Sequence, residues 1–351
     1  GAERWLAYDV DRHKLEGRAT RDVLPNAAFS PDGRWLFAAY GGALRRLGLD
    51  DGTVVEIPFE VDVSLEVTPT LRFDRRLDTG PVRARRVEQI ALADHGGVAF
   101  SALGRIWVTD TGGGPPRRLT GTARAREFMP AWSADGRWIA FVTWDEEGGA
   151  LWKARADGTG APVRLTTAPA SWSDPVWTPD GTGVVALTAP LGSTLALPPG
   201  AVPPDAQVVL VPAGGGGART LAPAQGARRP HFVAEPEGGE GLRVWLSGPA
   251  DLVSVGLASG DVRVEARLSQ GAGRGAALRA SPTGDAVALE AGGRILRMPM
   301  DPDGILPRQL DPAAGVPVAE ATISDWAWSP DGTTVAWVEG SVLRRAAATG
   351  A

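Results

Sequence analysis

The sequence has no cysteine, and its 351 residues include only two lysines, Lys14 and Lys153. The lack of cysteine excludes disulfide bonds, thiol nucleophiles and cysteine-ligated metal sites, and it fits an exported protein as well as a cytosolic one. Arginine carries almost all the positive charge, and no basic stripe with interleaved aromatic residues is present. Nucleic acid is therefore not an expected partner. No apolar run approaches the ~18 residues that a transmembrane helix needs.

Turn-forming residues are abundant, and they recur in one motif. The sequence holds 46 glycines and 29 prolines, spread along its length, and shows almost no helical periodicity. A five-residue stretch with an aromatic head and an Asp-Gly end has four clear copies, at 29–33, 132–136, 177–181 and 328–332. Three degraded copies begin at Leu92, Ala234 and Ala280. Pro sets φ, Asp bonds to nearby backbone and Gly accepts positive φ, so the motif predicts a tight turn.

A short apolar strand follows each copy of the motif, and most copies are followed by further strands. Successive copies begin 40 to 63 residues apart, near the ~40–50-residue period of propeller blades. A four-stranded sheet cannot bury both faces alone, but a ring of such sheets covers them. We therefore predict an all-β fold, a seven-bladed β-propeller of four-stranded antiparallel blades. The N-terminal strands are expected to close the ring by pairing with the last blade.

The expected boundaries follow from the motif spacing within a single domain. Residues 1–20 supply outer strands of the last blade, and a Pro/Gly-rich insertion at 190–206 interrupts the fourth. The seven blades are expected at 21–58, 59–125, 126–168, 169–224, 225–270, 271–318 and 319–346.

The repeats resemble those of TolB-like (PD40, WD40-like) propellers, which occur in periplasmic TolB proteins, prolyl oligopeptidase-type peptidases and tricorn-like proteases. Several stretches are most similar to the N-terminal propeller of bacterial propeller-containing amidohydrolases: 80–87, 100–110, 127–158, 228–232 and 325–337. The resemblance covers essentially the whole chain, but only the propeller half of that family. It implies a periplasmic or secreted location after removal of a signal peptide, with a cytoplasmic location left open.

The metal chemistry of those hydrolases does not carry over to this sequence. Their catalytic domain holds its metals with a His-x-His motif, further histidines and an aspartate. The three histidines here are His13, His95 and His231, and none stands in that spacing. No Gly-x-Ser-x-Gly nucleophile motif is found either. We therefore expect no catalytic residues, no metal and no cofactor, and we expect the hydrolase domain to be absent from this chain.

A ring of polar residues is predicted on the innermost strands, three places before each motif head. The ring consists of Asn26, Gln89, Met129, Asp174, His231, Ala277 and Asp325. The polar members could bind a cation, an amine-bearing ligand or the tip of a partner. They could equally hydrogen-bond buried water and backbone in the channel.

Arg229, beside His231, completes the candidate binding residues at the channel mouth. A metal at His231 is disfavoured because no second histidine lies at ligand spacing. Trp172 and Trp326 are expected to flank the mouth, where packing between blades is favoured over a role as a ligand platform.

Three functions remain open from the sequence. The favoured one is a non-catalytic protein-interaction or scaffolding module that docks to or gates a hydrolase partner or a larger assembly. The second is the propeller portion of a metal-dependent amidohydrolase whose catalytic domain lies outside this chain. The third is a solitary propeller that binds a small ligand at its channel mouth.

Overall fold

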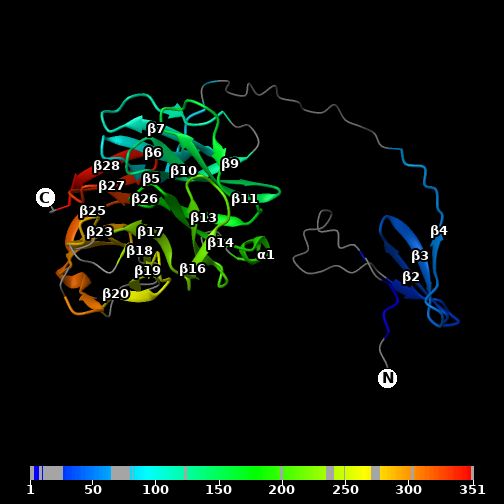
Figure 1. Cartoon of the computed structure of the whole chain (residues 1–351). Helices are drawn as coiled ribbons and strands as arrows, with labels where there is room; N and C mark the ends of the chain where they lie inside the picture. The colour runs from blue at the N-terminus through cyan, green and yellow to red at the C-terminus, as the bar shows by residue number, and fades with distance from the viewer. Residues whose placement is uncertain are drawn as a thin grey trace. The chain divides into compact units, whose positions relative to one another are not determined.

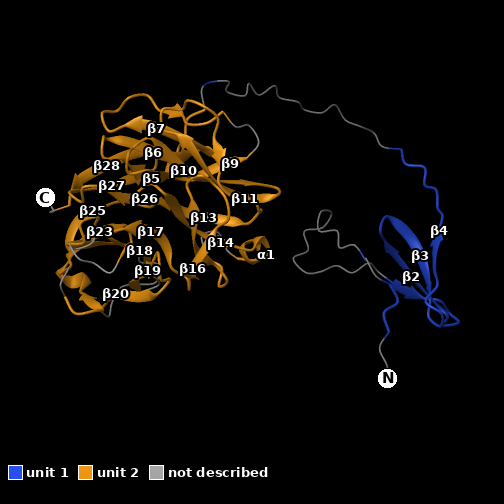
Figure 2. Cartoon of the chain, viewed as in Figure 1, with its two compact units in different colours: residues 1–80 blue, residues 81–351 orange. Residues whose placement is uncertain are grey.

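Strands follow the turn motifs as predicted, and they form seven sheets. The computed structural model describes residues 4–7, 10, 27–64, 80, 82–121, 125–197, 201–234, 241–248, 250–269, 277–301 and 304–348. Two compact units are distinguished, Gly1–Gly80 and Pro81–Ala351 (Figure 2). The prediction of an all-β fold built from seven antiparallel sheets is confirmed.

Unit 1 contains one antiparallel sheet. Its strands, in spatial order, are β1 (Ala27–Phe29), β2 (Trp35–Tyr40), β3 (Ala43–Gly48) and β4 (Val54–Ile57). In β2 only Ala38 is buried. This sheet therefore leaves much of its apolar surface exposed, including Phe29 and Val54.

Unit 2 contains six sheets, whose first strands lie toward the middle of the unit (Figure 1). The first three are β5 (Glu88–Leu92), β6 (Gly97–Ala102), β7 (Arg105–Asp110) and β8 (Arg117–Arg118); β9 (Arg126–Trp132), β10 (Trp138–Asp145), β11 (Gly148–Arg155) and β12 (Val163–Arg164); and β13 (Ser171–Trp177), β14 (Gly183–Ala189), β15 (Gln207–Pro212) and β16 (Arg219–Pro223). The predicted insertion joins β14 to β15 and includes the short helix α1 (Leu191–Leu195).

Among the described residues, the three remaining sheets have five, four and three strands. They are β17 (Arg228–Phe232), β18 (Arg243–Ser247), β19 (Asp251–Gly256) and β20 (Val262–Leu268); β21 (Ala277–Ala280), β22 (Ala286–Ala291), β23 (Arg294–Pro299) and β25 (Val316–Glu320); and β26 (Asp325–Trp328), β27 (Thr334–Glu339) and β28 (Val342–Ala347). The connection from β23 to β25 contains β24 (Arg308–Leu310), followed by a 3₁₀ turn (Pro312–Ala314). Strand β24 pairs parallel with β20, so residues expected in the sixth sheet extend the fifth.

Among the described residues of unit 2, six apolar clusters form the core, and each lies between two neighbouring sheets of the ring. Each cluster holds residues of both sheets; in order around the unit, examples are Ile106 and Phe141, Leu151 and Val184, Val208 and Val244, Leu252 and Leu278, Ile295 and Trp326, and Ile90 and Val338. Middle strands such as β14 are buried on both faces, which explains their near-continuous apolar sequence. Burying each such aliphatic side chain contributes about 2 kcal/mol.

The sixth cluster closes the ring, because it packs the last sheet of unit 2 on the first. Ile90 of β5 contacts Ala336 and Val338 of β27, and strands β5 and β26 lie side by side (Figure 1). The backbone N–H of Val87 donates to the carbonyl of Gly340 at 2.8 Å. The six sheets of unit 2 thus form a closed ring among themselves.

The predicted pairing of the N-terminal strands with the last blade falls on residues 1–20. Of these, the structure describes only residues 4–7 and 10, and it assigns them to no strand. Arg4 donates to the carbonyls of Leu49 and Asp50 within unit 1. The pairing stays a prediction.

The repeated motif is a turn held by its aspartate. In the last copy, the Ser329 hydroxyl and the Thr333 backbone N–H both donate to Asp331 Oδ1, and Gly332 has φ 70°. These hydrogen bonds lower the pKa of Asp331, the one from Ser329 most of all. The copies at Asp32, Asp135 and Asp180 repeat the arrangement.

In the sixth sheet, Thr283 stands at the aspartate position of the motif. Asp285, two residues later, accepts the hydrogen bond from the Ser281 hydroxyl instead. The turn therefore keeps a carboxylate although the motif is degraded.

Replacing Asp331 with alanine should lower the free energy of unfolding by about 1 kcal/mol, because the Ser329 and Thr333 donors lose their acceptor at a solvent-exposed turn. Urea denaturation followed by circular dichroism measures the change. The matched control Glu146→Ala, on the exposed turn between β10 and β11, should change it by less than about 0.5 kcal/mol. Equal stability of both variants and the parent would contradict a structural role for Asp331.

Candidate ligand-binding site at the channel mouth

The first strands of all six sheets of unit 2 meet at one cavity of about 200 Å³. Its walls are Gln89 and Ile90 of β5, Met129 and Pro130 of β9, Asp174 and Pro175 of β13, Arg228, Arg229, Pro230 and His231 of β17, Arg279 of β21, and Asp325 of β26. Since each sheet contributes at least one residue, the cavity lies on the axis of the ring.

Four of these strands carry the same β-bulge at the cavity. In β5, β9, β13 and β17, two residues face one residue of the next strand. The first bulge residues are Gln89, Met129, Asp174 and Arg229, with φ between 50° and 56°. Left-handed backbone at a residue other than glycine costs on the order of 1 kcal/mol. Of the described non-glycine residues with positive φ, these four lie at the channel and two, Leu103 and Gln225, lie elsewhere.

The second bulge residue would leave a backbone N–H unpaired, and two devices avoid this. In three strands the residue is proline, which has no N–H: Pro130, Pro175 and Pro230. The exception is Ile90, whose N–H donates to Asp325 Oδ2 at 2.8 Å. Asp325 thus completes the bulge of the neighbouring sheet.

Ring side chains also accept from the first bulge residue of the next sheet. The Met129 N–H donates to Gln89 Oε1 at 2.9 Å, and the Asp174 N–H lies 3.1 Å from Met129 Sδ. Part of the polar ring therefore stabilises the bulged backbone, as one of the two readings from sequence expected.

Asp325 also forms ion pairs with two arginines that line the cavity. Its Oδ1 atom lies 3.5 Å from Arg279 Nη2 and 3.6 Å from Arg229 Nη2, and the residue is 8% exposed. Arg279 also donates to the carbonyl of Trp326 and stacks over its ring at 4.8 Å. Burial, reinforced by the charge of Arg229, lowers the pKa of Arg279 to about 10, so the guanidinium remains charged at neutral pH.

His231 is held in one neutral form by two main-chain contacts. The Ala280 N–H donates to Nε2 at 3.1 Å, so Nε2 carries no proton. Nδ1 lies 3.0 Å from the Arg229 carbonyl and must be the protonated nitrogen. Burial, together with the charge of Arg279, lowers the pKa of His231 to about 4.

The structure brings five of the eight predicted site residues together: Gln89, Asp174, Arg229, His231 and Asp325 all line the cavity. Asn26 lies outside the described residues. Trp172 and Trp326 are buried in the cores between sheets and do not line the cavity, although Trp326 supports Arg279.

Arg279 was missed because it lies one residue before the motif head, on a strand without a bulge. The position three residues before the motif head, which predicted the polar ring, is occupied by Ala277 in this sheet. In β17 the bulge residue is Arg229, two residues before His231. The X-Pro pair shared by Met129, Asp174 and Arg229 was the sequence signal that could have aligned this strand correctly.

The charges around the cavity disfavour a cation. Both nitrogens of His231 are engaged with main chain, and two guanidinium groups approach Asp325. Among the residues that the structure describes, no group of three potential metal ligands is found.

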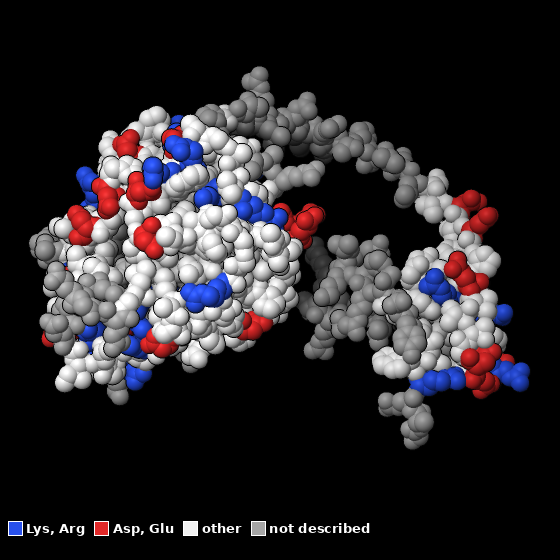
Figure 3. All heavy atoms as spheres, viewed as in Figure 1, with Lys and Arg blue, Asp and Glu red and all other residues white. Residues whose placement is uncertain are grey.

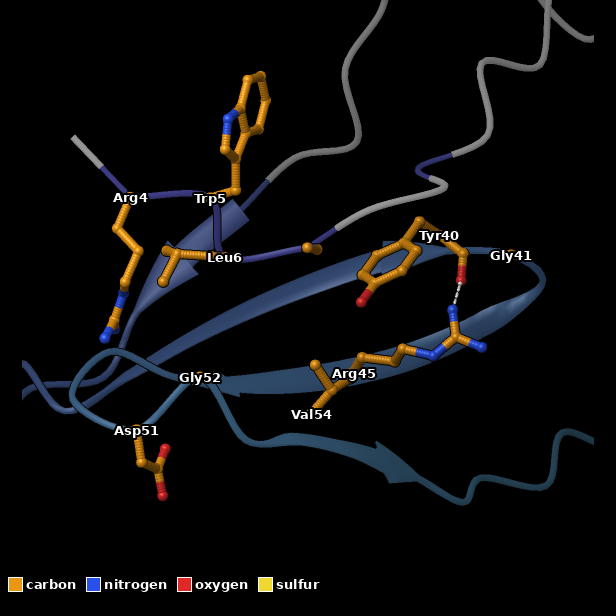
Figure 4. Close-up of a pocket in the computed structure, with 10 residues that line it drawn as sticks. Arg4, Trp5, Leu6, Tyr40, Gly41, Arg45, Asp51, Gly52 and Val54 are labelled. Carbon is orange, nitrogen blue, oxygen red and sulfur yellow. Dashed lines mark hydrogen bonds between the residues drawn. The ribbon is translucent and has the colours of Figure 1, made fainter.

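A second cavity, of about 640 Å³, lies in unit 1 between residues 4–7 and the sheet (Figure 4). The Arg45 guanidinium lies 4.6 Å from the centre of the Tyr40 ring and donates to the Tyr40 carbonyl at 2.5 Å. It also lies 3.6 Å from Glu56. Since these groups already pair with each other, the cavity in unit 2 is the better candidate.

On the face shown in Figure 3, acidic and basic side chains of unit 2 are interspersed in small groups. This agrees with the absence of a basic stripe in the sequence. Within the described ranges, no helix has both the length and the apolar character required to cross a membrane.

Comparison with known structures identifies the fold. Oligogalacturonate lyase in complex with manganese aligns with a TM-score of 0.50 at 12% identity, covering 90% of this chain and 85% of that one. The fold is a β-propeller. TolB from Acinetobacter baumannii aligns with a TM-score of 0.45 at 15% identity, covering 79% of this chain and 60% of that one. The expectation of a β-propeller is confirmed at the level of the fold.

Sequence comparison gives a partial relative. The uncharacterized peptidase YuxL of Bacillus subtilis (strain 168) is 38% identical over 96 residues. These residues are 26% of this propeller chain but 14% of the peptidase. No family model matches the chain.

Protonation of His231 should destabilise the folded propeller. Its pKa is about 4 when folded and about 6.5 when unfolded, so the unfolded state binds more protons between these values. The free energy of unfolding should therefore fall as the pH is lowered from about 6.5 to 4. Urea denaturation at a series of pH values should show a smaller slope for His231→Gln in this window, and parallel curves above pH 7. Identical slopes would contradict the assignment.

Proposed function

We propose that the protein is a non-catalytic binding module, which holds part of a protein partner at the channel mouth of unit 2. The observation that carries this proposal is the cavity lined by all six sheets, with strained backbone directed at it. Strained residues that surrounding structure maintains are typical of functional sites. Two of the cavity groups suited to acid–base work are already committed, since His231 is bound to main chain and Asp325 to Ile90 and two arginines.

The size of the cavity favours a partner over a free small ligand. Sites for drug-sized molecules enclose ~300–1,000 Å³, whereas this cavity encloses about 200 Å³. A volume of that size accommodates a side chain or a chain end, and the rest of the partner would contact the rim. Arg228 is exposed at this rim and is available for such a contact.

A second candidate is the propeller portion of a larger hydrolase, in which the module docks to or gates a catalytic domain. The partial likeness to a peptidase, over 14% of that protein, supports this candidate. Both candidates use the same mouth, and both are compatible with the periplasmic or secreted location that the resemblance implies.

Photo-crosslinking from the cavity rim tests the proposed function. A photoreactive amino acid at position 228 should give a discrete protein adduct in extracts of the source cells, identifiable by mass spectrometry. Excess unlabelled protein should suppress this adduct. The same amino acid at Val163, on the outermost strand β12 of its sheet, serves as the control and should not give it. Equal adducts from both positions, or none from position 228, would contradict the proposal.

A further inference from the structure

The cavity carries more positive than negative charge. Three arginines, Arg228, Arg229 and Arg279, line the cavity together with Asp174 and Asp325. His231 adds no charge at neutral pH, since both of its nitrogens are held in the neutral form. Three positive and two negative groups leave an excess of one positive charge.

Asp325 does not exhaust the donors of the two buried arginines. Its contacts to Arg229 and Arg279, at 3.6 and 3.5 Å, exceed the 2.7–3.2 Å range of good hydrogen bonds. Its other oxygen accepts from the Ile90 N–H. Among the described residues, the buried atoms Arg229 Nη1 and Arg279 Nε have no hydrogen-bond acceptor. A buried donor left unpaired costs about 1–3 kcal/mol, so Asp325 leaves the hydrogen-bonding capacity of both guanidinium groups partly unused.

The arrangement favours one type of anion. A guanidinium presents a planar fork of N–H donors that matches a carboxylate. The single excess charge suits a monoanion, whereas a phosphate group near neutral pH carries more than one negative charge, about 1.5 to 2 in a phosphomonoester. Pro130, Pro175 and Pro230 add apolar wall to the cavity, which suits an organic group attached to the anion.

We infer that the channel mouth binds a carboxylate group of its ligand, held by the guanidinium groups of Arg229 and Arg279 that line the cavity. This inference rests on the proposed function and names the chemistry of the group that enters the cavity. A chain-terminal carboxylate and an acidic side chain share that chemistry.

The test uses the whole purified protein with arginine side chains labelled for NMR, so that the Nε–H signal of Arg279 reports binding. N-acetylglycine represents a chain terminus, and N-acetylglutamic acid α-amide represents an acidic side chain. Each acid should shift the Arg279 signal in a saturable manner. The corresponding amides, N-acetylglycinamide and N-acetylglutamine amide, should bind at least tenfold more weakly, as should inorganic phosphate. The stronger of the two acids identifies the source of the carboxylate.

Lysine variants keep the positive charge but lack the planar set of N–H donors, so they test whether the guanidinium geometry is needed for binding. Arg229→Lys and Arg279→Lys should each weaken binding of the preferred acid at least tenfold, measured by calorimetry or by shifts of backbone amides at the cavity. Arg344→Lys, on the outer strand β28, is the matched control and should leave binding unchanged. If a variant fails to fold, the comparison of acid with amide on the parent protein still decides.

Equal binding of acid and amide to the parent protein would overturn the inference, as would unchanged acid binding by both folded lysine variants. The outcome is separable from that of the proposed function. If saturating acid does not suppress the protein adduct at position 228, the proposal of a protein partner is supported and the inference of a bound carboxylate is overturned. If the acid binds but no adduct forms, the inference of a bound carboxylate is supported and the proposal of a protein partner is overturned.

Discussion

The packing of β5 against β26 is the contact on which the rest of unit 2 depends. A four-stranded sheet cannot bury its two faces alone, and five of the six interfaces join sheets that follow one another in the chain. The sixth joins β5 to the last sheet. There Ile90 shares an apolar cluster with Val338, and its N–H donates to Asp325, 235 positions away in the sequence. Without this contact, one face of the first sheet and one of the last would be exposed to water.

Closure of the ring also assembles the candidate site. It places Asp325 beside the bulge at Ile90, and there the same carboxylate faces Arg229 and Arg279. One side chain therefore satisfies the backbone of one sheet and orients the cations of two others. The donors it leaves unused are the basis for expecting an anionic ligand group. Stability of the ring and the chemistry of its mouth are thus coupled through Asp325.

Local signals in the sequence predicted much of this structure. The Pro-Asp-Gly turns located the sheets, and Asp331 proved to hold a turn, as Asp285 does where the motif is degraded. Inner-strand polarity placed Gln89, Asp174 and Asp325 at the cavity. The direct packing of β5 on β26 has no local signal, because it joins segments remote in sequence. Arg229 lies five residues before its motif head and Arg279 one residue before its own, so a spacing of three residues selected neither.

Native-state hydrogen exchange at the amides of Val87 and Ile90 tests the ring closure most directly. These N–H groups donate across the closing interface, to the carbonyl of Gly340 and the carboxylate of Asp325. If closure holds unit 2 together, both amides should exchange only through global unfolding of that unit. Their exchange free energies should then match those of core amides such as Leu187 in β14. Exchange of Val87 and Ile90 by local opening, far faster than Leu187, would contradict the account.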